Sequence, residues 1–126
     1  MSKIAKAIFL IDAILCFIIG AFLLIIPGDT LTWVGWVPYD PLMTRLVGAA
    51  LLALGWGAFR AWRATQYRDI AILVEVEFLF GVLGAIGLLR HLLQAYYPPI
   101  GWISFALLVV PALAWGYVWL TRPRNI

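Results

Sequence analysis

Four apolar stretches, each close to 20 residues long, dominate the sequence and limit what the chain can fold into. They cover about residues 5–26, 42–62, 70–93 and 100–120. A helix needs about 20 apolar residues to cross the roughly 30 Å of hydrocarbon in a bilayer. Backbone N–H and C=O groups in lipid must also be hydrogen-bonded internally, which a helix achieves within one segment. The sequence therefore predicts an all-α integral membrane protein with four transmembrane helices.

Composition supports a membrane location and a single domain. Of the 126 residues, 65% are hydrophobic and 12% are charged, and the mean hydropathy is +1.01. A soluble domain is roughly half apolar and about a quarter charged. Because the polar stretches between the spans are short, we expect residues 1–126 to form one integral membrane domain, with the lipid bilayer as its first partner.

Prolines and short polar links mark the ends of the predicted spans. Pro27 ends the first span, Pro41 opens the second and Pro98 precedes the fourth. The link RATQYRD, residues 63–69, is so short that the helices on either side must be antiparallel neighbours. The expected architecture is an up-down-up-down four-helix bundle.

A short internal similarity raises the alternative of two duplicated helical hairpins within this bundle. The sequence ALGWG, residues 53–57, matches ALAWG, residues 112–116, and the pair GA at residues 20–21 recurs at residues 84–85. The two matches need different offsets. If the duplication is real, both hairpins enter the membrane from the same side.

Basic residues predict the orientation of the chain. One end of the expected bundle carries Lys3, Lys6, Arg60, Arg63, Arg68, Arg122 and Arg124, and the other carries Arg45 and Arg90. Since cytoplasmic loops are enriched in Lys and Arg, we expect both termini to be cytoplasmic, in a plasma membrane such as a cell inner membrane. The net charge of +3 is explained by this topology, and no basic cluster with solvated aromatic residues indicates nucleic-acid binding.

The longest link between spans, PGDTLTWVGWVPYDP at residues 27–41, is unusually apolar. Asp29 or Thr30 is a candidate N-cap, and Trp33 and Trp36 are three residues apart, so a short helix lying on the outer surface is expected. Such a helix either anchors the chain at the interface or forms a lid over a cavity, and anchoring is the simpler interpretation.

Three acidic residues lie within the predicted spans. Asp12 is in the first span, and Glu75 and Glu77 are in the third. At 1.5 Å per residue all three lie in one layer, roughly 8–11 Å from the cytoplasmic end of their helices. An ionisable side chain at the centre of a transmembrane helix costs about 2.5–3.5 kcal/mol on insertion scales, so such residues are candidates for function.

The two glutamates cannot face the same neighbour, because residues two apart on a helix project about 200° apart. Glu77 shares its face with Gly81 and Gly84, which indicates close helix packing. Glu75 shares its face with bulky apolar residues: Leu79, Val82 and Ile86. We therefore expect Glu77 to be buried in the bundle and Glu75 to face lipid, a broad cavity or a second subunit.

Arg60 is a candidate ion-pair partner for Glu77, because it lies near the inner end of the adjoining second span. Asp12, Glu77 and Arg60 could simply hold the helices in register through satisfied polar contacts. The alternative is a functional role, in which an unpaired Asp12 or Glu75 exchanges protons.

The opposite end of the bundle carries a second polar group, formed by Arg45, Arg90, His91 and Asp40. Arg45 and Arg90 could pair with aspartates there or bind anionic lipid headgroups. His91 has no second ligand at metal spacing, so it is interpreted as an interfacial polar residue, with no metal site and no cofactor. No phosphate-binding loop, CxxC, HExxH or nucleophile elbow is present in the sequence, which therefore offers no positive support for enzymatic activity.

The second and third spans support a family resemblance. The second span contains RLVGAALLALGWG, residues 45–57, and the third contains GVLGAIG, residues 81–87. With four short spans, this pattern resembles the small DoxX-like four-helix membrane proteins and neighbouring uncharacterised families. The resemblance covers most of the chain and implies a four-helix membrane fold, and it transfers no functional residue. Asp12 is also similar to the first-span acid of small multidrug-resistance transporters, in a different local setting.

Three functions remain open at this point. The leading interpretation is a non-enzymatic protein that self-associates or acts as an accessory subunit of a larger membrane complex, with Glu75 contacting the partner. The alternative is a small transporter or a protein that binds a hydrophobic ligand or lipid, using Asp12 and Glu75 in a membrane cavity. An enzyme acting on lipid, with Glu75 or Glu77 as general base, has the least support, because no nucleophile or metal site accompanies them.

Overall fold

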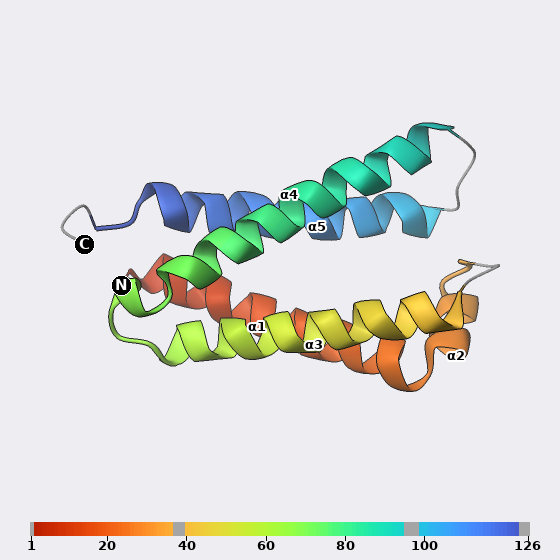
Figure 1. The fold of residues 1–126 in the computed structure, drawn as a ribbon, viewed down its shortest axis with the longest axis horizontal. Coiled ribbons are helices and arrows are strands. Elements are labelled where there is room, and N and C mark those ends of the chain that lie inside the picture. The colour runs from red at the N-terminus through yellow and green to blue at the C-terminus, as the bar shows by residue number, and fades with distance from the viewer. Residues whose placement is uncertain (1, 37–39, 95–98, 124–126) are drawn as a thin grey trace.

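The structure, a computed structural model, describes residues 2–36, 40–94 and 99–123. Its helical elements are α1 (Lys3–Ile25), α2 (Pro27–Trp33), α3 (Pro41–Arg63), the 3-10 turn η1 (Tyr67–Asp69), α4 (Ala71–Gln94) and α5 (Pro99–Leu120) (Figure 1). Among the described residues, α1, α3, α4 and α5 are long and apolar enough to cross a membrane. Each of these helices begins and ends within two residues of a predicted span, and the prediction of an all-α four-helix bundle is confirmed.

Local capping explains where two of these helices begin. The Ser2 hydroxyl accepts a hydrogen bond from the backbone N–H of Ala5 at the start of α1. The Asp40 carboxylate accepts from the N–H groups of Leu42 and Met43 at the start of α3, where Pro41 occupies the first turn. Both side chains satisfy N–H groups that the helix itself leaves unpaired. Asp40 thus has a structural role as an N-cap.

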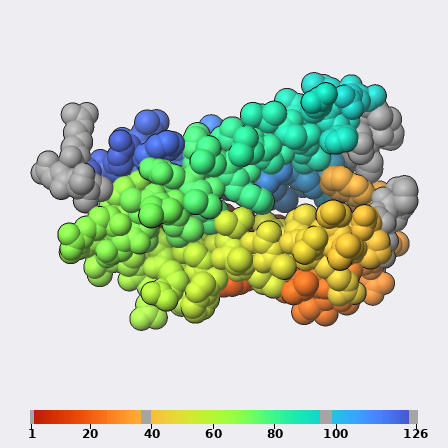
Figure 2. All heavy atoms as spheres, in the orientation of Figure 1, coloured from red at the N-terminus to blue at the C-terminus, as the bar shows by residue number. Residues whose placement is uncertain are grey.

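The four spans are arranged as two antiparallel helix pairs (Figure 1). Helix α1 packs along α3, and α4 packs along α5, whereas contacts between the two pairs are fewer. We call the end with the N-terminus, η1 and the end of α5 the terminal end, and the end with α2 the distal end. The pairs touch at the terminal end and separate towards the distal end, where the surface is hollowed between α3 and α4 (Figure 2).

The buried core lies at the terminal end and joins all four spans. Its members are Ala5, Phe9, Ala13, Ala58, Ala61, Tyr67, Ile70, Val74, Trp115 and Val118. The largest fully buried side chain is that of Trp115, which stacks on Phe9 with ring centroids 5.0 Å apart. Many large apolar residues elsewhere on the spans are exposed, as expected for helix faces that are solvated by lipid.

Glycines allow close backbone contact within each pair. A Cβ atom at Gly48 of α3 would lie 2.6 Å from the Leu24 nitrogen and 2.8 Å from the Gly20 oxygen of α1. In the other pair, a Cβ atom at Gly81 would lie 2.7 Å from the Ala112 Cβ. Small residues at such crossings let helix backbones approach closely in membranes. Gly48 and Gly81 of the small-residue pattern therefore serve contacts within the helix pairs, whereas Gly57 of α3 faces Leu73 of α4 in the other pair.

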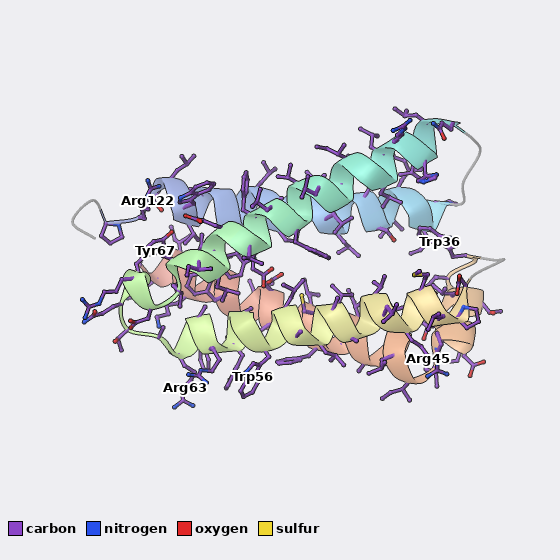
Figure 3. The ribbon with its side chains drawn as sticks, viewed as in Figure 1. Trp36, Arg45, Trp56, Arg63, Tyr67 and Arg122 are labelled. Carbon is purple, nitrogen blue, oxygen red and sulfur yellow. The ribbon has the colours of Figure 1, made fainter. Side chains whose placement is uncertain are left out.

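The matching ALGWG and ALAWG segments occupy different environments. Trp56 of α3 is 56% exposed, whereas Trp115 of α5 is 0% exposed. Figure 3 shows Trp56 pointing away from the body of the bundle. The arrangement as two antiparallel pairs fits a pair of hairpins, but the equivalent tryptophans do not share a structural role, and duplication stays a hypothesis.

Candidate functional site

Two buried carboxyl groups lie beside the core that joins the helix pairs. Asp12 of α1 is 8% exposed and Glu77 of α4 is 5% exposed. Packing places both beside one core: Trp115 of α5 donates to Asp12, and a Cβ atom at the next residue, Gly116, would lie 3.0 Å from the ring of Phe78, which follows Glu77. The structure thus brings together two of the three intramembrane acids, one from each helix pair.

The Asp12 carboxylate accepts hydrogen bonds from two side chains. The indole N–H of Trp115 donates to Asp12 Oδ2 at 3.3 Å, across 103 residues of sequence. The Cys16 thiol, one helical turn along α1, points to Asp12 Oδ1 at 3.8 Å. The four-residue spacing of Asp12 and Cys16 could have indicated this contact from the sequence. The contact between Trp115 and Asp12 could not be predicted from sequence spacing, because it depends on the packing of α5 against α1.

Glu77 lacks the partner that the sequence suggested. Its Oε1 atom is buried and accepts no hydrogen bond from the residues that the structure describes. Arg60 is exposed and lines a separate cavity of about 570 Å³ at the terminal end, together with Arg63 and Asp69. The structure does not bring Arg60 to Glu77, because α3 packs mainly along α1 and Arg60 lies on the exposed face of α3.

Glu75 lies apart from this buried pair. It is exposed on α4, on the same face as the exposed side chains of Leu79 and Ile86. Glu75 lies towards the terminal end, where its charge and that of Arg122 act on the Tyr67 hydroxyl in opposite directions. Figure 3 shows Tyr67 and Arg122 at this end. Burial raises the pKa of Tyr67, whose hydroxyl has no hydrogen-bond partner in the described part of the chain.

Two cations tie the ends of α1 and α3 together. The Lys6 ammonium of α1 donates to the Trp62 carbonyl at 2.6 Å and to the Ala64 carbonyl, at the end of α3. The Arg45 guanidinium of α3 donates to the Leu24 carbonyl at 2.7 Å, at the end of α1. Cations at helix C-termini satisfy unpaired carbonyls and oppose the helix dipole. Arg45 therefore binds the backbone at the end of α1, and Lys6 binds the backbone at the end of α3. The sequence indicated Lys6 only as one of the basic residues that mark the cytoplasmic side.

A larger cavity lies at the distal end, between the two helix pairs. Its volume is about 660 Å³, and every membrane-spanning helix contributes to its wall. Apolar side chains dominate the lining: Ile19, Phe22, Leu23, Leu31, Val34, Trp36, Met43, Val47, Leu88, Ile100, Leu107 and Leu108. Figure 3 shows Trp36 at this end, between the pairs. The cavity is an apolar space in the half of the bundle away from the termini.

Polar groups in the cavity wall are few and mostly engaged within the protein. They belong to Thr30, Asp40, Thr44 and Ser104. The Thr30 hydroxyl donates to the Ile26 carbonyl, the Thr44 hydroxyl donates to the Asp40 carbonyl, and the Asp40 carboxylate caps α3. The cavity therefore suits an apolar occupant that makes few hydrogen bonds.

Helix α2 occupies the region where the sequence predicted a short helix. Thr30 and Leu31 of α2 line the distal cavity, whereas Trp33 is exposed. The helix thus forms part of the cavity wall and also presents a large apolar side chain outward. Both the lid and the anchoring interpretation are compatible with this placement.

The remaining polar residues predicted from the sequence lie neither in the buried Asp12–Glu77 pair nor in the wall of the distal cavity. Arg90 and His91 are exposed near the end of α4 and are not among the residues that line the distal cavity. Within residues 2–36, 40–94 and 99–123, no group of three or more His, Cys, Asp or Glu side chains could hold a metal ion. Asp12 and Glu75 also lie outside the distal cavity.

Comparison with known proteins finds no match for this chain among protein-family models, curated proteins or solved structures.

Proposed function

We propose that this protein binds a hydrophobic, lipid-like molecule in its distal cavity, without catalysing a reaction. The observation that supports the proposal is the apolar space of about 660 Å³ between the two helix pairs. Binding sites for small molecules are typically apolar clefts of about 300–1,000 Å³ with a few polar groups. The size and lining of the distal cavity fall within this class.

The physical reason for binding is the cost of leaving the space empty. Apolar cavities do not hold water well, since a buried water needs two to four polar partners. Unfilled space also forfeits dispersion contacts for the side chains that line it. An acyl chain or a similar apolar molecule recovers those contacts, and the separated helix pairs provide its walls.

The proposed orientation places this cavity in the half of the membrane away from the cytoplasm. At the terminal end, the described residues include Lys3, Lys6, Arg60, Arg63, Arg68 and Arg122, against Arg45 and Arg90 at the distal end. By the excess of Lys and Arg in cytoplasmic segments, the terminal end is cytoplasmic. A plasma-membrane location and the DoxX-like resemblance remain predictions of the sequence.

Filling the cavity tests the proposal. Ser104→Phe places a large ring in the cavity wall, and Ala106→Phe places the same ring on the exposed face of the same helix. We expect a fluorescent stearic acid analogue to bind the wild type and Ala106→Phe saturably. Ser104→Phe should bind at least about tenfold more weakly, a difference of about 1.4 kcal/mol. Equal affinity for both variants, with both folded by circular dichroism, would contradict cavity binding.

A second candidate function is association through the exposed face of α4. Glu75 lies there among large exposed apolar residues, Ile72, Leu79 and Ile86. An ionisable group facing hydrocarbon is costly, and a polar group on a partner chain would lower that cost. In this proposal the protein is a self-associating bundle or an accessory subunit.

Native mass in mild detergent tests this second candidate. If the wild type forms oligomers, Glu75→Leu should shift them to monomers, and Leu83→Ala, on an exposed position of the same helix, should change the mass less. A wild type that is monomeric and free of co-purifying protein in a lipid nanodisc would argue against association.

A further inference from the structure

The buried pair of Asp12 and Glu77 has no compensating cation among the described residues. On α1, the nearest basic side chain towards the terminal end is Lys6, whose ammonium is bound by the Trp62 and Ala64 carbonyls of α3. On α3, Arg60 is exposed. On α5, Trp115 contributes only an uncharged indole N–H.

Two carboxyl groups in these surroundings cannot both remain ionised at low cost. Burial removes the water that stabilises each charge, and like charges at short range repel each other strongly in a medium of low polarity. Neighbouring buried carboxyl groups respond by retaining one proton between them. The arrangement therefore favours a pair with a total charge of −1 over a pair with −2.

The hydrogen bonds indicate which residue holds the proton. Asp12 accepts from the Trp115 indole at one oxygen and from the Cys16 thiol at the other, and donors of this kind stabilise the charged form. Glu77 Oε1 is buried with no hydrogen-bond partner within residues 2–36, 40–94 and 99–123, and Glu77 is 95% buried, since 5% of it is exposed. A neutral carboxylic acid leaves much less uncompensated charge at that position than a carboxylate does.

We propose that Asp12 and Glu77 form a proton-binding site between the two helix pairs, with the proton on Glu77 and the negative charge on Asp12. The proton comes from water, forms an O–H bond on a Glu77 carboxylate oxygen, and returns to water when the site empties. The site is independent of the distal cavity, because neither residue lines it. Emptying the site places two negative charges at the junction of the pairs and opposes their contact there.

Infrared spectroscopy of the protein in lipid bilayers at pH 7 tests the site directly. A protonated carboxyl group has a C=O stretching band separate from that of a carboxylate, and this band shifts when the O–H proton is exchanged for deuterium. We expect one such band per wild-type chain and its loss in Glu77→Gln. Glu75→Gln, two residues away on an exposed position, is the matched control and should keep the band.

The wild-type spectrum is decisive even if Glu77→Gln does not fold. Absence of the protonated carboxyl band from folded wild-type protein at pH 7 would overturn the proposal. Binding of radioactive sodium ions to the wild type without that band would assign the site to a metal cation instead. Loss of the band in Glu75→Gln, with native circular dichroism, would place the proton on Glu75 and would contradict the proposal. Because none of these readouts involves a hydrophobic ligand, they are separate from the test of cavity binding.

Discussion

Replacing Gly48 with alanine should lower the free energy of unfolding by about 2–3 kcal/mol, within the range for overpacking a tight contact. The added Cβ atom would lie 2.6 Å from the Leu24 nitrogen and 2.8 Å from the Gly20 oxygen. Both are backbone atoms of α1, which cannot rotate away as a side chain could. The α1–α3 pair must therefore move apart along its main contact.

The matched control is Gly87→Ala in α4, where an added Cβ atom meets nothing within 4 Å. Alanine has the higher helix propensity by roughly 1 kcal/mol, so this change should leave stability unchanged or raise it slightly. The check is the unfolding transition in mixed detergent micelles, followed by circular dichroism. If both variants lost stability equally, the close α1–α3 contact would not be the reason for the effect.

Replacing Trp115 with alanine should destabilise the bundle by about 3–5 kcal/mol, the range for removing a buried tryptophan or phenylalanine. Trp115 is fully buried, stacks on Phe9 of α1 and donates to Asp12. Its loss removes the ring stacking between α5 and α1 and takes one hydrogen-bond donor from a buried carboxylate. Trp115→Phe should cost less, about 1–3 kcal/mol, because a ring remains but the donor is lost.

Trp102→Ala provides the comparison, because Trp102 is on the same helix and 44% exposed. We expect a loss below about 1 kcal/mol, in line with substitutions away from buried features. The measurement is the same unfolding transition, with a double-mutant cycle between Trp115→Phe and Asp12→Asn to isolate the hydrogen bond. A Trp102 variant as unstable as Trp115→Ala would show that Trp115 is not the specific link between the helix pairs.

Much of the fold could be predicted because membrane crossing imposes strict local rules. Span length and hydropathy located α1, α3, α4 and α5 to within two residues, since a helix must match the thickness of the hydrocarbon. Helical periodicity also separated a buried Glu77 from an exposed Glu75, because residues two apart on a helix point in nearly opposite directions. These inferences need only one helix at a time.

Inferences about partners depended on which helices pack together. The short link between α3 and α4 suggested that they are antiparallel neighbours, and hence that Arg60 would meet Glu77. In the structure α3 packs mainly along α1, so Arg60 is exposed, and Glu77 is buried beside the same core as Asp12 instead. A short link constrains where two helix ends lie, but it does not determine which faces pack.

The sequence by itself determined the number, length and polarity of the membrane-spanning helices, because hydrocarbon requires apolar side chains and internally bonded backbone along each one. Only the tertiary structure decided that the helices form two pairs, that Trp115 reaches Asp12, and that a cavity opens at the distal end. Those features arise from contacts between residues far apart in the chain, at glycine crossings within each pair and a core confined to one end, which no local pattern encodes.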